Sequence, residues 1–280
     1  MRLITALLVL VSLSYGQWVV TTIQLSDSLS GLDSICSIQF HSPNHTVYIG
    51  SDRTLVAVDA GTHWTLARIN LPGSPNMLCG STESNKLYCA PISQESVWVV
   101  DCATNQFLTT VTLDGQVREM CYAAGLNKVY VACPPDSLVN VIDCETDSVV
   151  ARIDVPSWPS ALCYNPELNR IYVAKQTADE VAVIDCAADT VISTIWVRGV
   201  KPAAICYDSV TNCVYTANYT SGTSSVIDCV GDSLVRIVTV GVKPERVSAL
   251  RPTCPLPHVG IYTDVLTDQE SYLICRVRKQ

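Results

Sequence analysis

Short runs of β-forming residues alternate with polar turns along the chain, and the alternation is regular. In the clearest stretch, apolar runs cover 161–164, 170–174, 181–185 and 190–197, with turn or polar residues between them. Runs of this length, rich in Val, Ile and Thr, predict β-strands, and their close spacing leaves no room for helices. Four strands therefore make up one unit in this region.

Two residue types recur along the chain with the same period. Successive tyrosines lie 40 to 47 residues apart and successive aspartates 42 or 43 apart, at Tyr48, Tyr88, Tyr130, Tyr172, Tyr215 and Tyr262 and at Asp59, Asp101, Asp143, Asp185 and Asp228. Because two independent residue types keep one period, the chain is predicted to repeat a single structural unit. Four strands in roughly 40–45 residues are typical of one blade of a β-propeller.

The fold expected from this repeat is an all-β, six-bladed β-propeller with four antiparallel strands per blade. The last unit stops after its third strand, whereas 18–25 matches the fourth strand of other units, such as 108–113. We expect this N-terminal strand to complete the last blade and close the ring, which leaves no exposed sheet edge. A seven-bladed or an incomplete propeller is the alternative. The predicted blades cover 34–71, 76–113, 118–155, 160–197, 203–240 and 246–278 plus 18–25.

Three second-strand segments carry a resemblance to a known repeat. The segments at 128–132, 170–174 and 213–218 resemble the Tyr-Val-Thr-Asn (YVTN) β-propeller repeat, and so do the Val-Ile-Asp segments that end at Asp143, Asp185 and Asp228. The resemblance implies a propeller of the exported, surface-layer-like kind. That family often has seven blades, and it has no shared catalytic motif whose residues could be placed on this chain.

The first residues predict export. Arg2 precedes an apolar run over 3–13, and Ser14 and Gly16 are small residues at the positions expected for cleavage before Gln17. We therefore expect a signal peptide over 1–16, a single propeller domain over 17–280, and a secreted, periplasmic or cell-surface protein. No membrane insertion is expected after signal removal. The net charge of -8 argues against nucleic acid as a partner, since nucleic-acid binding needs a basic surface.

Fourteen cysteines fit an exported protein, and eight of them follow the repeat. Four lie in first strands and four follow the third-strand aspartate, always 23 residues later, which pairs Cys79 with Cys102, Cys121 with Cys144, Cys163 with Cys186, and Cys206 with Cys229. A disulfide within each blade is one interpretation. Two strand spacings would separate the paired backbones by about 9.6 Å, beyond the roughly 7 Å that a disulfide spans. Free thiols in the core, or pairs between neighbouring blades, are the alternatives.

We interpret the remaining repeated residues as structural rather than as catalytic or ligand-binding. The third-strand aspartates are expected to close turns, and Asn85, Asn127, Asn169 and Asn212 to adopt the left-handed backbone of hairpins. Asp59 to Trp64 resembles the Asp-box turn of sialidases and is likewise interpreted as turn chemistry. No metal, cofactor or catalytic residue is predicted, because the expected starts of the inner strands supply only Asn76 and Glu119 as polar candidate ligands.

One weaker pattern concerns the loops that join successive blades. These loops are expected to share one face around the channel, and they hold a basic and aromatic set that forms a candidate ligand rim: Arg118, Trp158, Arg198, Lys201, Lys243 and Arg246. The leading hypothesis is a non-enzymatic interaction or cell-envelope scaffold whose partner is an unknown protein or surface polymer. The alternatives are a lactonase-like hydrolase of the channel mouth, or a binder of an anionic ligand or polymer on this rim.

Overall fold

The computed structural model describes residues 35–92, 94–249, 261–264 and 272–275. These residues confirm the all-β class, because they form strands and only three short 3-10 turns, at Ser42–Asn44, Ala124–Leu126 and Pro134–Asp136. Within the described ranges, no helix has the length and apolar character needed to cross a membrane.

Twenty strands form five separate four-stranded antiparallel sheets, and neighbours along the chain are neighbours in each sheet. The first sheet holds β1 (Ile35–His41), β2 (Thr46–Ser51), β3 (Thr54–Asp59) and β4 (Thr65–Asn70), and the second holds β5 (Met77–Ser81), β6 (Lys86–Ala90), β7 (Ser96–Asp101) and β8 (Gln106–Thr112). The third holds β9 (Glu119–Ala123), β10 (Lys128–Cys133), β11 (Leu138–Asp143) and β12 (Ser148–Asp154), and the fourth holds β13 (Pro159–Asn165), β14 (Arg170–Lys175), β15 (Glu180–Asp185) and β16 (Thr190–Trp196). The fifth holds β17 (Pro202–Asp208), β18 (Cys213–Asn218), β19 (Thr223–Asp228) and β20 (Ser233–Thr239).

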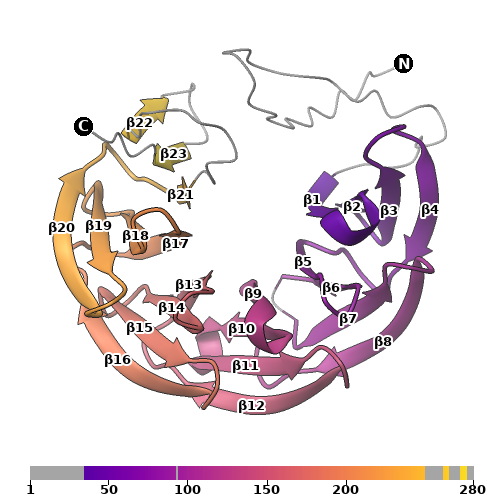
Figure 1. Cartoon of the computed structure of the whole chain (residues 1–280), viewed down its shortest axis with the longest axis horizontal. Helices are drawn as coiled ribbons and strands as arrows, with labels where there is room; N and C mark the ends of the chain where they lie inside the picture. Colours follow the sequence, from indigo (N-terminus) through magenta and orange to yellow (C-terminus); the bar gives the residue numbers. More distant parts are fainter. Residues whose placement is uncertain (1–34, 93, 250–260, 265–271, 276–280) are drawn as a thin grey trace.

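The five sheets follow one another around an arc, with each first strand on the inside and each fourth strand on the outside (Figure 1). Successive sheets pack face to face, and the core is divided into clusters that lie between them. One such cluster joins Tyr88 and Val99 of the second sheet to Val129 and Ile142 of the third. The middle strands are buried along almost their whole length, since a neighbouring sheet covers each of their faces. This explains why they read as continuous apolar runs rather than as alternating ones.

The sixth unit differs, and the predicted six-bladed closed ring is wrong. Its strands β21 (Arg246–Ala249), β22 (Ile261–Asp264) and β23 (Tyr272–Cys275) form a three-stranded sheet in the order β21-β23-β22, with β21 parallel to β23. Within the described part of the chain, no sheet joins the first unit to the last. The predicted closing strand at 18–25 lies outside the described residues.

The spacing of the sixth unit offers a physical reason for the difference. In the first five units, a four-residue turn holds the first strand beside the second, whereas residues 250–260 separate β21 from β22. That stretch of sequence includes three prolines, Pro252, Pro255 and Pro257, which cannot donate a backbone hydrogen bond. A tight hairpin that would pair β21 with β22 is therefore not encoded there.

Both expectations about turn residues are confirmed. The side chain of Asp143 accepts the backbone N–H groups of Glu145 and Thr146 at 3.1 and 2.8 Å, and the other third-strand aspartates close their turns in the same manner. The asparagines before the second strands have left-handed backbones, with φ of 52° at Asn85 and 51° at Asn127. Asp59 also fits, since it accepts three hydrogen bonds from Gly61 and Thr62.

Candidate functional site

The structure places the predicted rim residues in the links between successive sheets. Arg118 precedes β9, Trp158 precedes β13, and Arg198 and Lys201 lie between β16 and β17. Lys243 lies between β20 and β21, and Arg246 is the first residue of β21, where its side chain is outside the described set.

An unusual backbone holds four of these residues. Trp158, Arg198, Lys201 and Lys243 have φ angles of 60°, 52°, 63° and 52°, in the left-handed region that non-glycine residues rarely enter. Trp158, Lys201 and Lys243 each precede a proline, which adds a further preference for extended backbone. Such a conformation costs on the order of 1–3 kcal/mol per residue and persists only where the surroundings impose it.

Paired backbone hydrogen bonds supply that constraint. The carbonyl of Lys201 accepts the N–H of Tyr219 at 2.9 Å, and the carbonyl of Val200 accepts the N–H of Thr220 at 3.1 Å. An equivalent pair of bonds holds the link between β12 and β13. The carbonyls of Trp158 and Ser157 accept the N–H groups of Gln176 and Thr177, which follow β14. The oxygen Oδ1 of Asp179 also accepts the N–H of Lys201 at 2.7 Å. The links are therefore tied to the neighbouring loops rather than free to rearrange.

Two of the rim cations meet at a single aromatic ring. The Nζ atom of Lys201 lies 4.8 Å from the ring centre of Tyr219, and the Nζ atom of Lys243 lies 5.8 Å from the same centre. Both lysines are exposed, and neither forms an ion pair with a carboxylate within the described ranges. Tyr219, in the loop between β18 and β19, was not a predicted site residue. This arrangement can attract an anion without first breaking a salt bridge.

The other rim residues are arranged separately. The guanidinium carbon of Arg198 lies 5.6 Å from the ring centre of Trp196, at the end of β16. Trp158 is 42% exposed and Arg118 is bonded through its backbone to Ala132, and neither has a described contact with the two lysines. The structure therefore brings together Lys201 and Lys243, with Arg198 on the same link as Lys201.

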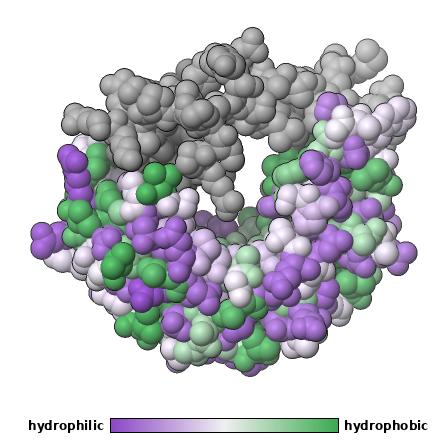
Figure 2. All heavy atoms as spheres, viewed as in Figure 1, coloured by the Kyte–Doolittle hydropathy of each residue, from purple (hydrophilic) through white to green (hydrophobic). Residues whose placement is uncertain are grey.

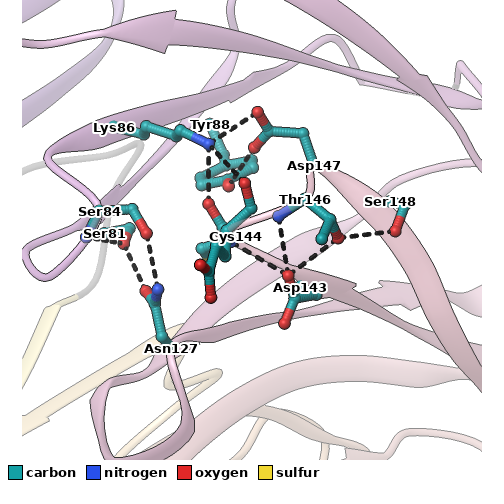
Figure 3. A network of polar contacts seen from close by, with 11 residues as sticks. Ser81, Ser84, Lys86, Tyr88, Asn127, Asp143, Cys144, Thr146, Asp147 and Ser148 are labelled. Carbon is teal, nitrogen blue, oxygen red and sulfur yellow. Dashed lines mark hydrogen bonds and ion pairs between the residues drawn. The ribbon is translucent and has the colours of Figure 1, made fainter.

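A second polar network lies between the second and third sheets (Figure 3). Lys86 and Tyr88 of β6 both reach Asp147, which lies in the turn between β11 and β12. The Nζ atom of Lys86 is 2.7 Å from Oδ2, and the hydroxyl of Tyr88 donates to Oδ1 at 2.8 Å. Lys86 also donates to the carbonyl of Cys144 at 2.8 Å. Nearby, Asn127 accepts a bond from Ser81 and donates one to Ser84.

The same arrangement repeats around the arc, and we call it the latch: a cation and a tyrosine of one sheet both bind an aspartate of the next sheet. Lys128 and Tyr130 reach Asp189 of the next sheet at 2.6 Å each. The next latch joins Arg170 and Tyr172 to Asp232, both at 2.8 Å. The junction between the first and second sheets has no ion pair at this place. Thr46 takes the position of the cation, and the hydroxyl of Tyr48 donates to the neutral side chain of Asn105 at 2.9 Å. The regular spacing of tyrosines and of turn aspartates could have pointed to this latch from the sequence.

The latch is suited to holding sheets together rather than to catalysis. Burial raises the pKa of Tyr88, Tyr130 and Tyr172 far above the ordinary value, so their hydroxyls stay protonated and act as donors. The cations and carboxylates are already paired with one another. No group of three or more His, Cys, Asp or Glu side chains within the described ranges is arranged to hold a metal ion.

The twelve cysteines from Cys36 to Cys229 are free thiols in the structure. Cys79 lies in the core between the second and third sheets together with Cys144, whereas Cys102 lies in the core between the first and second. Burial raises the pKa of Cys144 and of Cys186 to about 11, which makes both poor nucleophiles at neutral pH. A disulfide within each sheet stays a prediction, to be tested by counting thiols.

The comparisons with known proteins bear on the fold. No family model matches the chain, and no curated protein sequence matches it. A chain from the crystal structure of the mitotic checkpoint complex is similar, with a TM-score of 0.71 and 11% identity over 88% of this chain and 75% of that one. Hydrazine synthase from Kuenenia stuttgartiensis is similar with a TM-score of 0.54 and 15% identity, over 81% and 92%. Both neighbours have β-propeller-type folds, and at such identities they establish the fold type alone.

Proposed function

We propose that this protein is a non-enzymatic interaction scaffold, and that it binds an acidic segment of a partner protein at Lys201, Lys243 and Tyr219. The proposal extends to location: the chain is exported, and the scaffold works in the periplasm, at the cell surface or outside the cell. One structural neighbour comes from a multiprotein complex, which is consistent with a scaffold of this fold type.

The observation that supports the binding site is the pair of ammonium groups at one ring. Each lies within cation–π distance of Tyr219, and such contacts are worth only about 0.5–1 kcal/mol at exposed sites. Two like charges that share one ring repel each other, and no described carboxylate forms an ion pair with either ammonium group. A carboxylate from a partner would relieve this repulsion, so binding gains more here than at a lysine that is already paired.

The backbone makes the site rigid. Lys201 and Lys243 are both held in left-handed conformations, and Lys201 is further fixed by its bonds to Tyr219 and Asp179. Because the positions of the lysine backbones are set before binding, little loop-ordering entropy is lost when a ligand arrives. Strained backbone of this kind concentrates at binding sites.

The test uses a fluorescently labelled peptide of six glutamates, titrated with the whole protein at low ionic strength. We expect saturable binding that weakens as salt is added, since exposed charges are screened. Replacing both lysines, Lys201→Gln with Lys243→Gln, should weaken binding at least 10-fold. The control is Arg53→Gln, an exposed cation in the β2–β3 loop, which is the first-sheet counterpart of the loop that holds Tyr219, and it should leave the affinity within about twofold. Equal affinity of the double variant and the wild type would overturn the proposal.

A further inference from the structure

The repeat provides an internal comparison that identifies residues with a special role. The last residue of each fourth strand occupies one register position, opposite the first residue of the third strand. In four of the five sheets this residue is polar, namely Asn70, Thr112, Asp154 and Thr239. In the fourth sheet it is Trp196, whose side chain is 60% exposed. A large exposed aromatic side chain at a position that is otherwise polar is not required by the fold.

The outer wall below Trp196 also exposes aliphatic side chains. Each fourth strand has a β-bulge at the same place, and the extra residue is always aliphatic and exposed: Leu66, Leu108, Val150, Ile192 and Val235. Bulges redirect a side chain and interrupt pairing at an exposed edge. On the fifth sheet, Ile237 is also exposed, two residues beyond Val235 and next to the exposed Arg236, and β20 is in contact with β16 of the fourth sheet. Figure 2 shows such hydrophobic patches among polar ones along the outside of the arc.

Trp196, at the upper end of this wall, lies next to the cationic residues. Trp196 stacks with Arg198, and Arg198 lies on the same link as Lys201. From Ile192 to Trp196 a strand advances about 13 Å, which is the length of four extended residues. The upper end of this wall is therefore positively charged, whereas below it exposed aliphatic side chains alternate with the exposed Thr194 and Arg236.

We infer that the ligand of this surface is an extended amphipathic segment with carboxylates at one end and large apolar side chains at the other. The carboxylates contact Lys201, Lys243 and Arg198, and the apolar side chains cover Trp196 and the aliphatic residues below it. This inference rests on the proposed function and adds the chemistry of the partner. The unpaired cations select acidic residues, and the exposed tryptophan selects apolar ones.

The experiment compares three labelled peptides: three glutamates followed by Leu-Phe-Leu, three glutamates followed by Ser-Ser-Ser, and three glutamines followed by Leu-Phe-Leu. The first should bind wild-type protein at least 10-fold more tightly than the second, because burial of a large apolar side chain against Trp196 favours binding. Trp196→Ser should abolish that difference and leave binding of the serine peptide unchanged. Leu66→Ser, at a matched bulge of the first sheet, should change neither the affinity for the leucine peptide nor the affinity for the serine peptide.

The outcomes distinguish failure of the inference from failure of the proposed function. If the leucine and serine peptides bind equally and both depend on the lysines, the inference is wrong while the proposed function stands. If neither acidic peptide binds, both are wrong. If only the glutamine peptide binds tightly, the ligand does not need carboxylates, and both proposals are wrong. If the protein instead self-associates, and Trp196→Ser disperses the oligomer in light scattering, the occupant is a second copy and the inference fails. Thermal unfolding of each variant confirms that it is folded.

Discussion

Replacing Tyr130 with phenylalanine removes one hydroxyl from the latch between the third and fourth sheets. That hydroxyl donates to the carboxylate of Asp189 at 2.6 Å, and the side chain of Asp189 is only 15% exposed. A hydrogen bond to a charged partner contributes about 1.5–3 kcal/mol, against about 0.5–1.5 kcal/mol for a neutral pair. Asp189 keeps its ion pair with Lys128 in the variant, so no buried charge is left unpaired. Tyr130→Phe should therefore cost about 2 kcal/mol of unfolding free energy.

The chain contains its own control for this prediction. Tyr48 occupies the same position in the first sheet, but its hydroxyl donates to the neutral side chain of Asn105 at 2.9 Å. Tyr48→Phe should cost about 1 kcal/mol, roughly half as much. Urea unfolding followed by tryptophan fluorescence measures both, as shifts of the transition midpoint at unchanged slope. Equal losses in the two variants would refute the reasoning, because the charge of the acceptor would then have no effect.

Three further predictions concern other parts of the fold. Asn127→Ala should lower stability by about 1 kcal/mol more than Asn127→Gly in urea unfolding, because both variants lose the side-chain bonds but only alanine strains a backbone with φ of 51°; equal losses would contradict this. Burial lowers the pKa of His41 below its ordinary 6.5, so the folded state resists protonation and wild-type stability should fall as the pH drops below that value. His41→Gln should weaken this pH dependence, and an unchanged profile would argue against it. Cys213, which is half-buried, should react with a thiol reagent in the native protein while Cys144 reacts only after unfolding; peptide mapping of the labelled sites decides.

The pairing of the cysteines needs a separate measurement. If the thiols are free throughout, protein denatured without reductant should titrate with all fourteen. A count lower by eight, with peptides that link Cys79 to Cys102 and Cys163 to Cys186, would establish disulfides within the sheets. Links from Cys79 to Cys144 would instead show pairing across a sheet junction, where the two share one core cluster.

Parts of the candidate site could be predicted from the sequence and parts could not. Lys201, Lys243 and Arg198 were identified because the basic residues fall in the links between repeats. Tyr219 was missed, because it lies in a different loop and only the packing of two links brings the lysines to its ring. Trp196 was also missed, although comparison among the repeats would have revealed it as the one aromatic residue at a polar position.

The strands of five sheets and the conformation of their turns could be predicted from the amino-acid sequence alone. This information is local: β-formers in runs of five to seven residues, aspartates that bind their own backbone, and asparagines that tolerate a left-handed φ act over a few residues and recur with every repeat. The latch between sheets and the ring shared by two lysines could be seen only in the folded protein. Each of these depends on groups far apart in the chain, whose distances are set by how whole sheets pack rather than by the residues beside them.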